Sequence, residues 1–251
     1  MSLLDSYDES KPLIVPGNFC KKGNYAKKCI VTFSNKVVAD AIKRYPHEIV
    51  ARVGTCNGKT PIYLIDFEGE KILLYMSLIT APAAGSNMEE VAYMTGATQF
   101  IVFGSCGSLD ELATKDKFII PTESYRGEGY SFYYVPKSDY IEIKNHSKLK
   151  AILDEMGLPT VEGKSFTTDA LYRETETIIA QRKKEGCICV EMESSALQAL
   201  CINKGYEFYT FFYISDLVGT KKWQNVCLGK ETEKLQQINC FDIALQIAKR
   251  I

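Results

Sequence analysis

The chain has 251 residues, 46% of them hydrophobic and 24% charged, which is the mixture of an ordinary globular protein. Its 30 Lys and Arg residues balance 31 Asp and Glu residues, so the formal charge of −1 gives no reason to expect binding to nucleic acid or an anionic membrane. No apolar run approaches the roughly 18 residues that a membrane span needs. The acidic residues near the start predict that residues 1–12 are not a secretory signal.

The chain has nine cysteines and two histidines, which limit the disulfide bonds and metal sites that it could form. The only close cysteine pair, Cys187 and Cys189, lies inside an apolar run, where both side chains share one face of a strand. Neither His47 nor His146 is near a cysteine in the sequence. We therefore expect reduced, mostly buried thiols, no zinc site and a cytoplasmic location.

Short apolar runs predict strands, and some of the segments between them have helical spacing. In 145–156 the apolar residues follow the i, i+3, i+4, i+7 pattern, and Gly157 and Pro159 end the helix. Glu68 and Gly69 separate two strand-like runs and predict a hairpin turn. The predicted strands are 29–33, 62–67, 72–77, 100–103, 118–120, 187–191 and 208–214, and the predicted helices are 145–156, 175–184, 192–204 and 231–249.

Strands that alternate with helices predict an α/β fold. We expect a three-layer α/β/α sandwich around a mixed, mostly parallel sheet, in one domain over 1–251 with an N-terminal extension over 1–25. Ligands in such folds bind beyond the carboxyl ends of the strands. This rule directs attention to the exits after Phe103, Val190 and Ile214.

Each of these exits carries residues suited to a binding site. After Phe103, Gly104-Ser105-Cys106-Gly107 predicts a backbone that can approach an anion, or else a tight surface turn. It is not a Walker A loop, because the G-K-[ST] sequence is absent.

The other two exits carry carboxylates. Glu191 and Glu193 follow Val190, where a carboxylate can accept hydrogen bonds from a vicinal diol or can favour a helix N-terminus. Asp216 follows Ser215 and predicts either a proton donor or a helix N-cap.

Taken together, the three motifs resemble the nucleoside phosphorylase family of purine nucleoside and uridine phosphorylases. The resemblance rests on G-S-C-G-S-L at 104–109, V-E-M-E-S-S-A-L at 190–197 and S-D at 215–216, and it extends over about 72–217. Segment 166–172 resembles the family segment beside the base pocket, and segments 122–138 and 167–175 look closest to a uridine phosphorylase-like bacterial branch. The resemblance implies phosphorolysis of the N-glycosidic bond of a ribonucleoside, without a metal or organic cofactor.

Carried over position by position, the resemblance implies roles for individual residues. Glu193 matches the glutamate that holds the ribose hydroxyls, Met192 the methionine packed on the sugar, and Asp216 the aspartate that protonates a purine, with Ser215 before it. Gly104 and Ser105 match the phosphate-binding loop. The expected substrate-binding set is Met192, Ser215, Phe166, Leu171, Tyr172 and Glu191.

The chain departs from the family at the phosphate arginines. The family's G-D-P-x-R loop is replaced by Phe33-Ser34-Asn35-Lys36-Val37, and Val102 stands where an arginine is usual. A charge-assisted bond to phosphate is worth roughly 1.5–3 kcal/mol, so other cations must replace these arginines if phosphate is the nucleophile. The candidates are Arg126, Arg173 and Arg52, each of which could instead form surface ion pairs.

Three functions follow as hypotheses. The first is a nucleoside phosphorylase, a pentosyltransferase that takes a purine or pyrimidine nucleoside and inorganic phosphate. The second is a nucleosidase, in which water replaces phosphate, and the third is a relative that binds a nucleoside without cleaving it. The resemblance also implies a homo-oligomer, a dimer or a hexamer, in which Arg52 completes a neighbour's site. Asp216 favours a purine, although Arg173 and Glu174 could read a pyrimidine edge.

Overall fold

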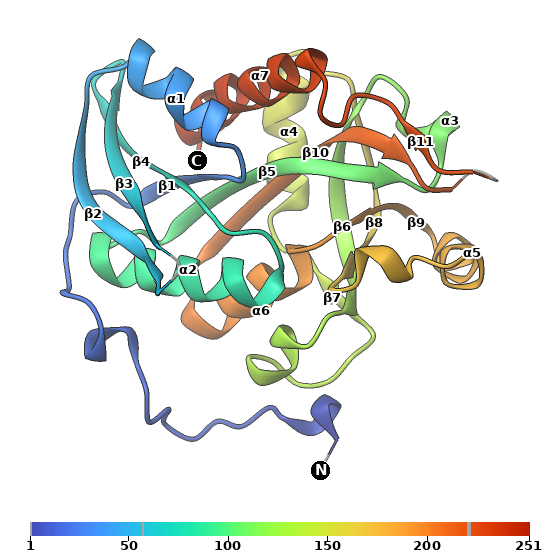
Figure 1. Ribbon diagram of the computed structural model, residues 1–251, viewed down its shortest axis with the longest axis horizontal. Coiled ribbons are helices and arrows are strands. Elements are labelled where there is room, and N and C mark those ends of the chain that lie inside the picture. Colours follow the sequence, from blue (N-terminus) through green and yellow to red (C-terminus); the bar gives the residue numbers. More distant parts are fainter. Residues whose placement is uncertain (1, 57, 220–221) are drawn as a thin grey trace.

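A mixed β-sheet of eleven strands forms the centre of the computed structural model, which describes residues 2–56, 58–219 and 222–251 (Figure 1). The strands are β1 (Lys28–Thr32), β2 (His47–Thr55), β3 (Gly58–Phe67), β4 (Glu70–Met76), β5 (Gln99–Ser108), β6 (Phe118–Gly127), β7 (Tyr140–Glu142), β8 (Thr160–Thr168), β9 (Cys187–Glu191), β10 (Glu207–Leu217) and β11 (Gln224–Asn225). The α-helices are α1 (Asn35–Arg44), α2 (Ala81–Thr95), α3 (Glu111–Thr114), α4 (His146–Glu155), α5 (Glu176–Lys184), α6 (Ser194–Lys204) and α7 (Glu231–Ala248).

The sheet combines both strand directions, which confirms the predicted mixed α/β fold. Parallel pairings join β1 to β4 and β5, β5 to β10, β6 to β8, and β8 to β9. The hairpin predicted around Gly69 is present between β3 and β4. Because β5 pairs with both β9 and β10, the strands β5, β10, β6, β8 and β9 close into a ring.

The pairing of β5 changes partway along the strand. One edge pairs with β1 over Gln99–Val102 and with β9 only at Gly107 and Ser108. Between these two ladders, residues 103–106 pair in the described sheet with β10 alone. The sheet therefore opens at the segment that carries Gly104 and Ser105.

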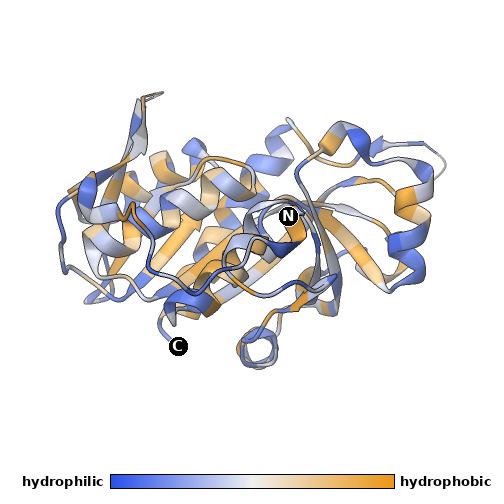
Figure 2. Ribbon diagram, turned by 90° about the horizontal axis from the view of Figure 1, so that it is seen from below, coloured by the Kyte–Doolittle hydropathy of each residue, from blue (hydrophilic) through white to orange (hydrophobic). Residues whose placement is uncertain are grey.

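Helices cover both faces of the sheet and make the three expected layers. In Figure 1, α1, α4 and α7 lie on one face, while α2 and α6 lie on the other. Val37 and Phe241 pack with Ile30 of β1 in the first core, and Met88 and Leu197 pack in the second. Figure 2 shows the most hydrophobic residues concentrated in the central strands between these helices.

Several strands extend beyond their predicted ends. β5 continues through Ser108, β6 through Gly127 and β10 through Leu217, so the three motifs lie within or at the ends of strands. The apolar runs stop earlier because the following residues are small or polar, yet their backbones still pair with neighbouring strands. Helix ends were easier to predict: Gly157 and Gly205 follow α4 and α6 with positive φ angles of 69° and 71°.

The first residues run along the outside of this core (Figure 1). They contain 3-10 turns at Leu3–Asp5 and Pro16–Asn18, and the N–H of Tyr25 donates to the carbonyl of Thr95 at the end of α2. Within the described residues, no helix combines the length and the apolar character that a membrane crossing requires.

Candidate active site

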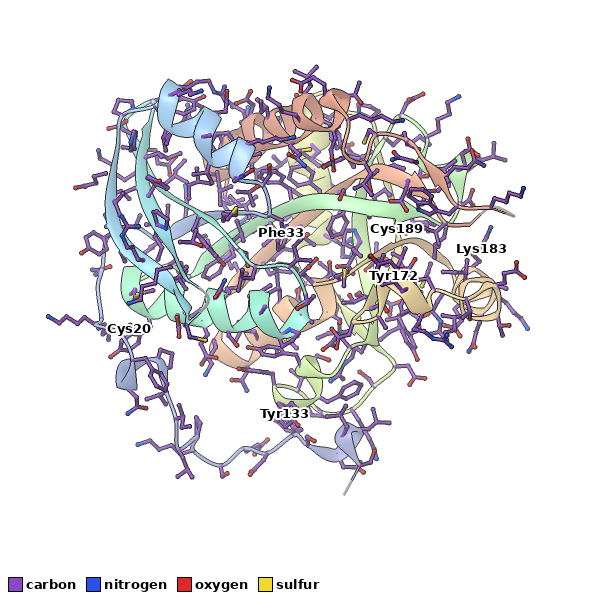
Figure 3. The ribbon with its side chains drawn as sticks, in the orientation of Figure 1. Cys20, Phe33, Tyr133, Tyr172, Lys183 and Cys189 are labelled. Carbon is purple, nitrogen blue, oxygen red and sulfur yellow. The ribbon has the colours of Figure 1, made fainter. Side chains whose placement is uncertain are left out.

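A cavity of about 1580 Å³ lies where the sheet opens between β1, β5, β9 and β10. It is lined by nine of the residues predicted for the site: Gly104, Ser105, Leu171, Tyr172, Glu191, Met192, Glu193, Ser215 and Asp216. In Figure 3, the labelled residues Phe33, Tyr172 and Lys183 come from three separate segments that line this cavity. The fold therefore gathers the three motifs that the sequence separates.

The floor of the cavity at Gly104 is covered by an aromatic ring. A Cβ atom at Gly104 would lie 3.4 Å from Cδ2 of Phe33, so the ring of Phe33 packs directly over the glycine. Beside it, the Ser34 hydroxyl donates to Oε1 of Gln237 at 2.6 Å. The backbone segment expected to hold phosphate thus faces an apolar ring and neutral polar side chains.

Glu191 is buried and fixes the turn that leads into α6. Its Oε1 accepts hydrogen bonds from the hydroxyls of Thr167 at 2.5 Å and Ser165 at 3.2 Å. Its Oε2 accepts from the backbone N–H groups of Glu193 at 2.8 Å and Ser194 at 2.7 Å. These hydrogen bonds fix the backbone at Glu193, and Glu191, which the sequence predicted to bind substrate, also lines the cavity.

Glu193 presents its carboxyl group to the cavity from the start of α6. Its Oε1 accepts a hydrogen bond from the backbone N–H of Thr80 at 2.8 Å, just before α2 begins. Burial, and then the neighbouring charge of Glu191, raise the pKa of Glu193 to about 8. At neutral pH the protonated form of this side chain is therefore favoured.

Thr80 holds its N–H in place through an unusual backbone conformation. Its φ of 85° and ψ of 147° lie in a region that side chains other than glycine rarely occupy. The residue precedes Ala81 and Pro82, which start α2. Backbone strain is thus concentrated where the chain reaches the carboxyl group of Glu193.

Asp216 accepts hydrogen bonds on both carboxylate oxygens. The Ser215 hydroxyl donates to Oδ1 at 2.7 Å, and the indole N–H of Trp223 donates to Oδ2 at 2.8 Å. A Cβ atom at Gly107 would lie 2.6 Å from Val218 and 3.4 Å from Oδ2 of Asp216, so only glycine leaves room here. These contacts hold Asp216 at the cavity wall.

Glu174 lines the same wall from the segment that precedes α5. Burial, and then the charge of Asp216, raise the pKa of Glu174 to about 7. Glu174 lies between β8 and α5, whereas Asp216 lies on β10, so two separate segments bring carboxyl groups to this wall. Glu174 was considered in the sequence only as a reader of the base.

The cavity lining carries more acidic than basic side chains. Among its described residues the cations are Lys183 and Lys222, and arginine is absent. The ammonium group of Lys183 donates to the carbonyl of Gly219 at 3.1 Å. The acidic lining residues are Glu174, Glu176, Glu191, Glu193, Asp216 and Glu233.

Arg126 lies outside the cavity, which corrects the expectation that its guanidinium reaches a ligand there. The side chain is buried under the segment after β6, with 4% of its surface exposed. It donates from Nε to the Ser131 hydroxyl at 2.8 Å and from Nη1 to the Pro136 carbonyl at 2.7 Å, and its guanidinium lies 4.0 Å from the centre of the Phe132 ring. Arg126 therefore organises the protein interior.

The remaining predicted residues also lie away from the cavity lining. Arg173 is exposed in a 3-10 turn, and Arg52 is exposed on β2 at the edge of the sheet. Phe166 is buried against Tyr125 in a small core next to β9. The cavity lining thus includes the predicted sugar-binding residues and the phosphate-loop residues Gly104 and Ser105, but not Phe166 or the three candidate arginines.

Four important residues had little or no signal in the sequence. Phe33 and Thr80 became relevant through packing and backbone angles, and Glu174 and Trp223 through their approach to Asp216. Trp223 is the only tryptophan in the chain, which was the one available clue.

Comparison with known proteins identifies the family. Residues 27–248 match the model of the Phosphorylase superfamily. The chain belongs to this superfamily. Its members among curated proteins include DeoD-type purine nucleoside phosphorylases of a Bacillus cereus strain, 24% identical over 185 residues, and of Bacillus thuringiensis strain Al Hakam, 23% identical over 185 residues. Each alignment covers 72% of this chain and 75% of the relative.

The protein shares its fold with a solved structure of a futalosine hydrolase mutant from Helicobacter pylori strain 26695. The two align with a TM-score of 0.70 and 13% sequence identity, covering 89% of this chain and all of the other. The protein thus combines membership of the Phosphorylase superfamily with the fold of this hydrolase structure.

Proposed function

We propose that the protein hydrolyses the N-glycosidic bond of a purine ribonucleoside, giving ribose and the free base. The observation that carries this proposal is the acidic cavity without arginine among its described lining residues. Phosphate carries between one and two negative charges at neutral pH, so such a lining repels it. Water needs no cation to bind.

The same charges favour the transition state of glycosidic cleavage. As the bond to the base breaks, positive charge develops on the ribose, and nearby carboxylates stabilise it. Glu193 is the carboxylate expected to accept the ribose hydroxyls, with Met192 packed on the sugar. The growing positive charge also lowers the pKa of Glu193 from about 8 and so favours release of its proton to solvent.

The region beside Ser105 suits a water molecule. Ser34, Tyr213 and Gln237 line the cavity together with Ser105 and offer neutral donors and acceptors. Phe33 lies against Gly104 and adds an apolar ring to this part of the lining. On the other side of the cavity, Leu171 and Tyr172 are placed to contact the base.

Phosphorolysis is the second candidate, and the exposed position of Arg52 favours it. In a homo-oligomer, β2 at the sheet edge could bring Arg52 of one copy to the cavity of another. The curated relatives are named as purine nucleoside phosphorylases. The buried thiols of Cys29 and Cys240 fit a reducing compartment, so we place either activity in the cytoplasm.

A chromatographic assay of base release tests the proposal. Adenosine, guanosine, inosine and uridine are each incubated with the protein, with and without inorganic phosphate. Hydrolysis predicts release of the purine bases without phosphate and a smaller rate with uridine. An Arg52→Ala variant tests whether a neighbouring copy supplies the cation. If the unmodified protein shows a phosphate-dependent rate and this variant loses it, phosphorolysis is favoured.

A further inference from the structure

We propose that Thr167 is a positioning residue: its hydroxyl group fixes Glu191 and the start of α6, so that the carboxyl group of Glu193 remains available to the ribose. The inference rests on the proposed function for the role of Glu193, and it concerns a residue outside the cavity lining. It is carried by hydrogen bonds that join β8, β9 and α6 behind the cavity wall.

Thr167 lies opposite Glu191 in the parallel ladder between β8 and β9 (Figure 1). The residue is completely buried. Its hydroxyl donates to Oε1 of Glu191 at 2.5 Å and accepts from the backbone N–H of Ser195 at 3.0 Å. A single side chain therefore bonds both to the carboxylate at the end of β9 and to the first turn of α6.

The start of α6 is capped by residues other than its own N-cap residue. The first N–H groups of a helix lack partners within the helix. Here the N–H groups of Glu193 and Ser194 donate to Oε2 of Glu191, and the N–H of Ser195 donates to Thr167. Glu193 occupies the N-cap position, yet its side chain makes no capping hydrogen bond. Because Glu191 and Thr167 satisfy these donors, the carboxyl group of Glu193 is left to line the cavity.

The hydroxyl group of Thr167 uses its full hydrogen-bonding capacity. Its one proton goes to Glu191, and one of its two lone pairs accepts from the N–H of Ser195. The hydroxyl of Ser124 lies 2.7 Å away and donates to the other lone pair, because the proton of Thr167 is already used. Loss of this hydroxyl therefore removes one donor from the carboxylate of Glu191 and the acceptor of one N–H of α6.

Two substrates separate a positioning role from a structural one. Adenosine presents both ribose hydroxyls to Glu193, whereas 2′,3′-dideoxyadenosine presents neither. Thr167→Val keeps the shape of the side chain but removes its hydroxyl. It should lower kcat/KM about 10-fold to 100-fold for adenosine and less than about threefold for 2′,3′-dideoxyadenosine, since the lost contact matters only where Glu193 has hydroxyls to hold. Thr167→Ser keeps the hydroxyl and should retain both values.

Thr210→Val is the matched control for loss of a buried threonine hydroxyl. Thr210 is also buried, on β10, and among the described residues its hydroxyl has no hydrogen-bond partner. It lies outside the cavity lining. This variant should leave the ratio of the two kcat/KM values unchanged.

A double substitution tests whether Thr167 acts through Glu193. Glu193→Gln removes the charge that holds the ribose hydroxyls. In that background Thr167→Val should change the ratio for the two substrates by less than about twofold, because the contact that Thr167 supports is already lost. Glu155→Gln, on the exposed surface of α4, is the matched control for the loss of one glutamate charge.

Circular dichroism and thermal melting establish that each variant is folded. If Thr167→Val does not fold, Ser165→Ala makes the same comparison, because Ser165 donates to the same Oε1 of Glu191 at 3.2 Å. Its longer bond predicts a smaller loss, about threefold to tenfold, again confined to adenosine.

The outcomes separate the inference from the function. Similar losses on the two substrates in Thr167→Val would show a structural cap alone and overturn the inference, as would unchanged kcat/KM on both. If the unmodified protein cleaves no nucleoside, the proposed function fails, and calorimetric Kd values for the same two compounds test the inference. Thr167→Val should then weaken binding of adenosine selectively, and equal effects on both compounds, or no binding of adenosine by the unmodified protein, would overturn it.

Discussion

The backbone N–H of Thr80 donates a hydrogen bond to Oε1 of Glu193 at 2.8 Å and so joins the start of α2 to the start of α6. The carboxyl group of Glu193 therefore lies beside the positive end of the α2 dipole. Glu191 fixes the same residue from the other side through the N–H of Glu193. The contact with Thr80 thus holds the carboxyl group of Glu193, and the contact with Glu191 holds its backbone.

Replacing Glu193 should remove most of the activity. Glu193→Gln keeps an oxygen that can accept from Thr80, but it cannot carry negative charge beside the ribose. We expect kcat/KM to fall at least about a hundredfold, as for other single preorganised electrostatic contacts. Steady-state kinetics on the best nucleoside measure the effect, with Glu155→Gln as the control. A variant with nearly unchanged kcat/KM would show that Glu193 does not stabilise the sugar.

The same substitution should stabilise the protein at alkaline pH. The pKa of Glu193 is about 8 in the folded protein and near 4.5 in the unfolded chain, so unfolding releases its proton more readily as pH rises between these values. This group's contribution to stability is present below about pH 4.5 and is lost as pH rises through about 8. Glu193→Gln should therefore melt at a higher temperature than the unmodified protein at pH 9, with a smaller difference at pH 5. A difference that does not vary with pH would contradict this assignment.

Thr80 should carry measurable backbone strain. Its positive φ of 85° suits glycine, and such conformations cost on the order of 1–3 kcal/mol in other residues. Thr80→Gly should therefore be more stable than Thr80→Ala, which keeps the Cβ atom and the strain. Urea unfolding of both variants measures the gap. Equal free energies of unfolding would mean that the backbone relaxes without glycine.

Arg126 should matter for folding and not for phosphate. Its guanidinium bonds to Ser131 and Pro136 at once, which an ammonium group cannot reproduce. Arg126→Lys should lower the free energy of unfolding by about 2 kcal/mol or more, since a hydrogen bond to a charged group is worth about 1.5–3 kcal/mol. The exposed Arg173→Lys should change it by less than about 0.5 kcal/mol. A folded Arg126→Lys with normal stability and a raised KM for phosphate would restore Arg126 as a ligand-binding residue.

The sequence predicted helices well where one physical requirement sets both the residue pattern and the backbone structure. The spacing in α4 and the glycines that follow α4 and α6 predicted those elements, because burial of one face and a positive φ directly constrain residue type. The sequence did not predict the ends of several strands, because small or polar residues after the apolar run still pair through their backbones with a neighbouring strand. In β5, the ladder with β10 extends the strand through Ser108 after the apolar run has ended at Phe103.

The acidic candidates of the cavity could be found in the sequence, but their partners could not. Glu193 and Asp216 stand at recognisable motifs, and both line the cavity. Phe33 and Gly104 are 71 residues apart in the sequence, and Glu174 and Asp216 are 42 residues apart, so neither pair could be seen before the fold was known. For Arg126 the sequence was misleading. The nearby glycines suggested an accessible side chain, but the structure shows that it is buried and hydrogen-bonded.

The identity of the sugar product tests the central claim most directly. The protein is incubated with a purine nucleoside in the presence of saturating inorganic phosphate, and the products are followed by phosphorus-31 nuclear magnetic resonance and by a reducing-sugar assay. The acidic cavity predicts free ribose as the product, at a rate that phosphate does not increase. Formation of ribose 1-phosphate in amounts equal to the released base would contradict hydrolysis and require a cation from beyond the described cavity.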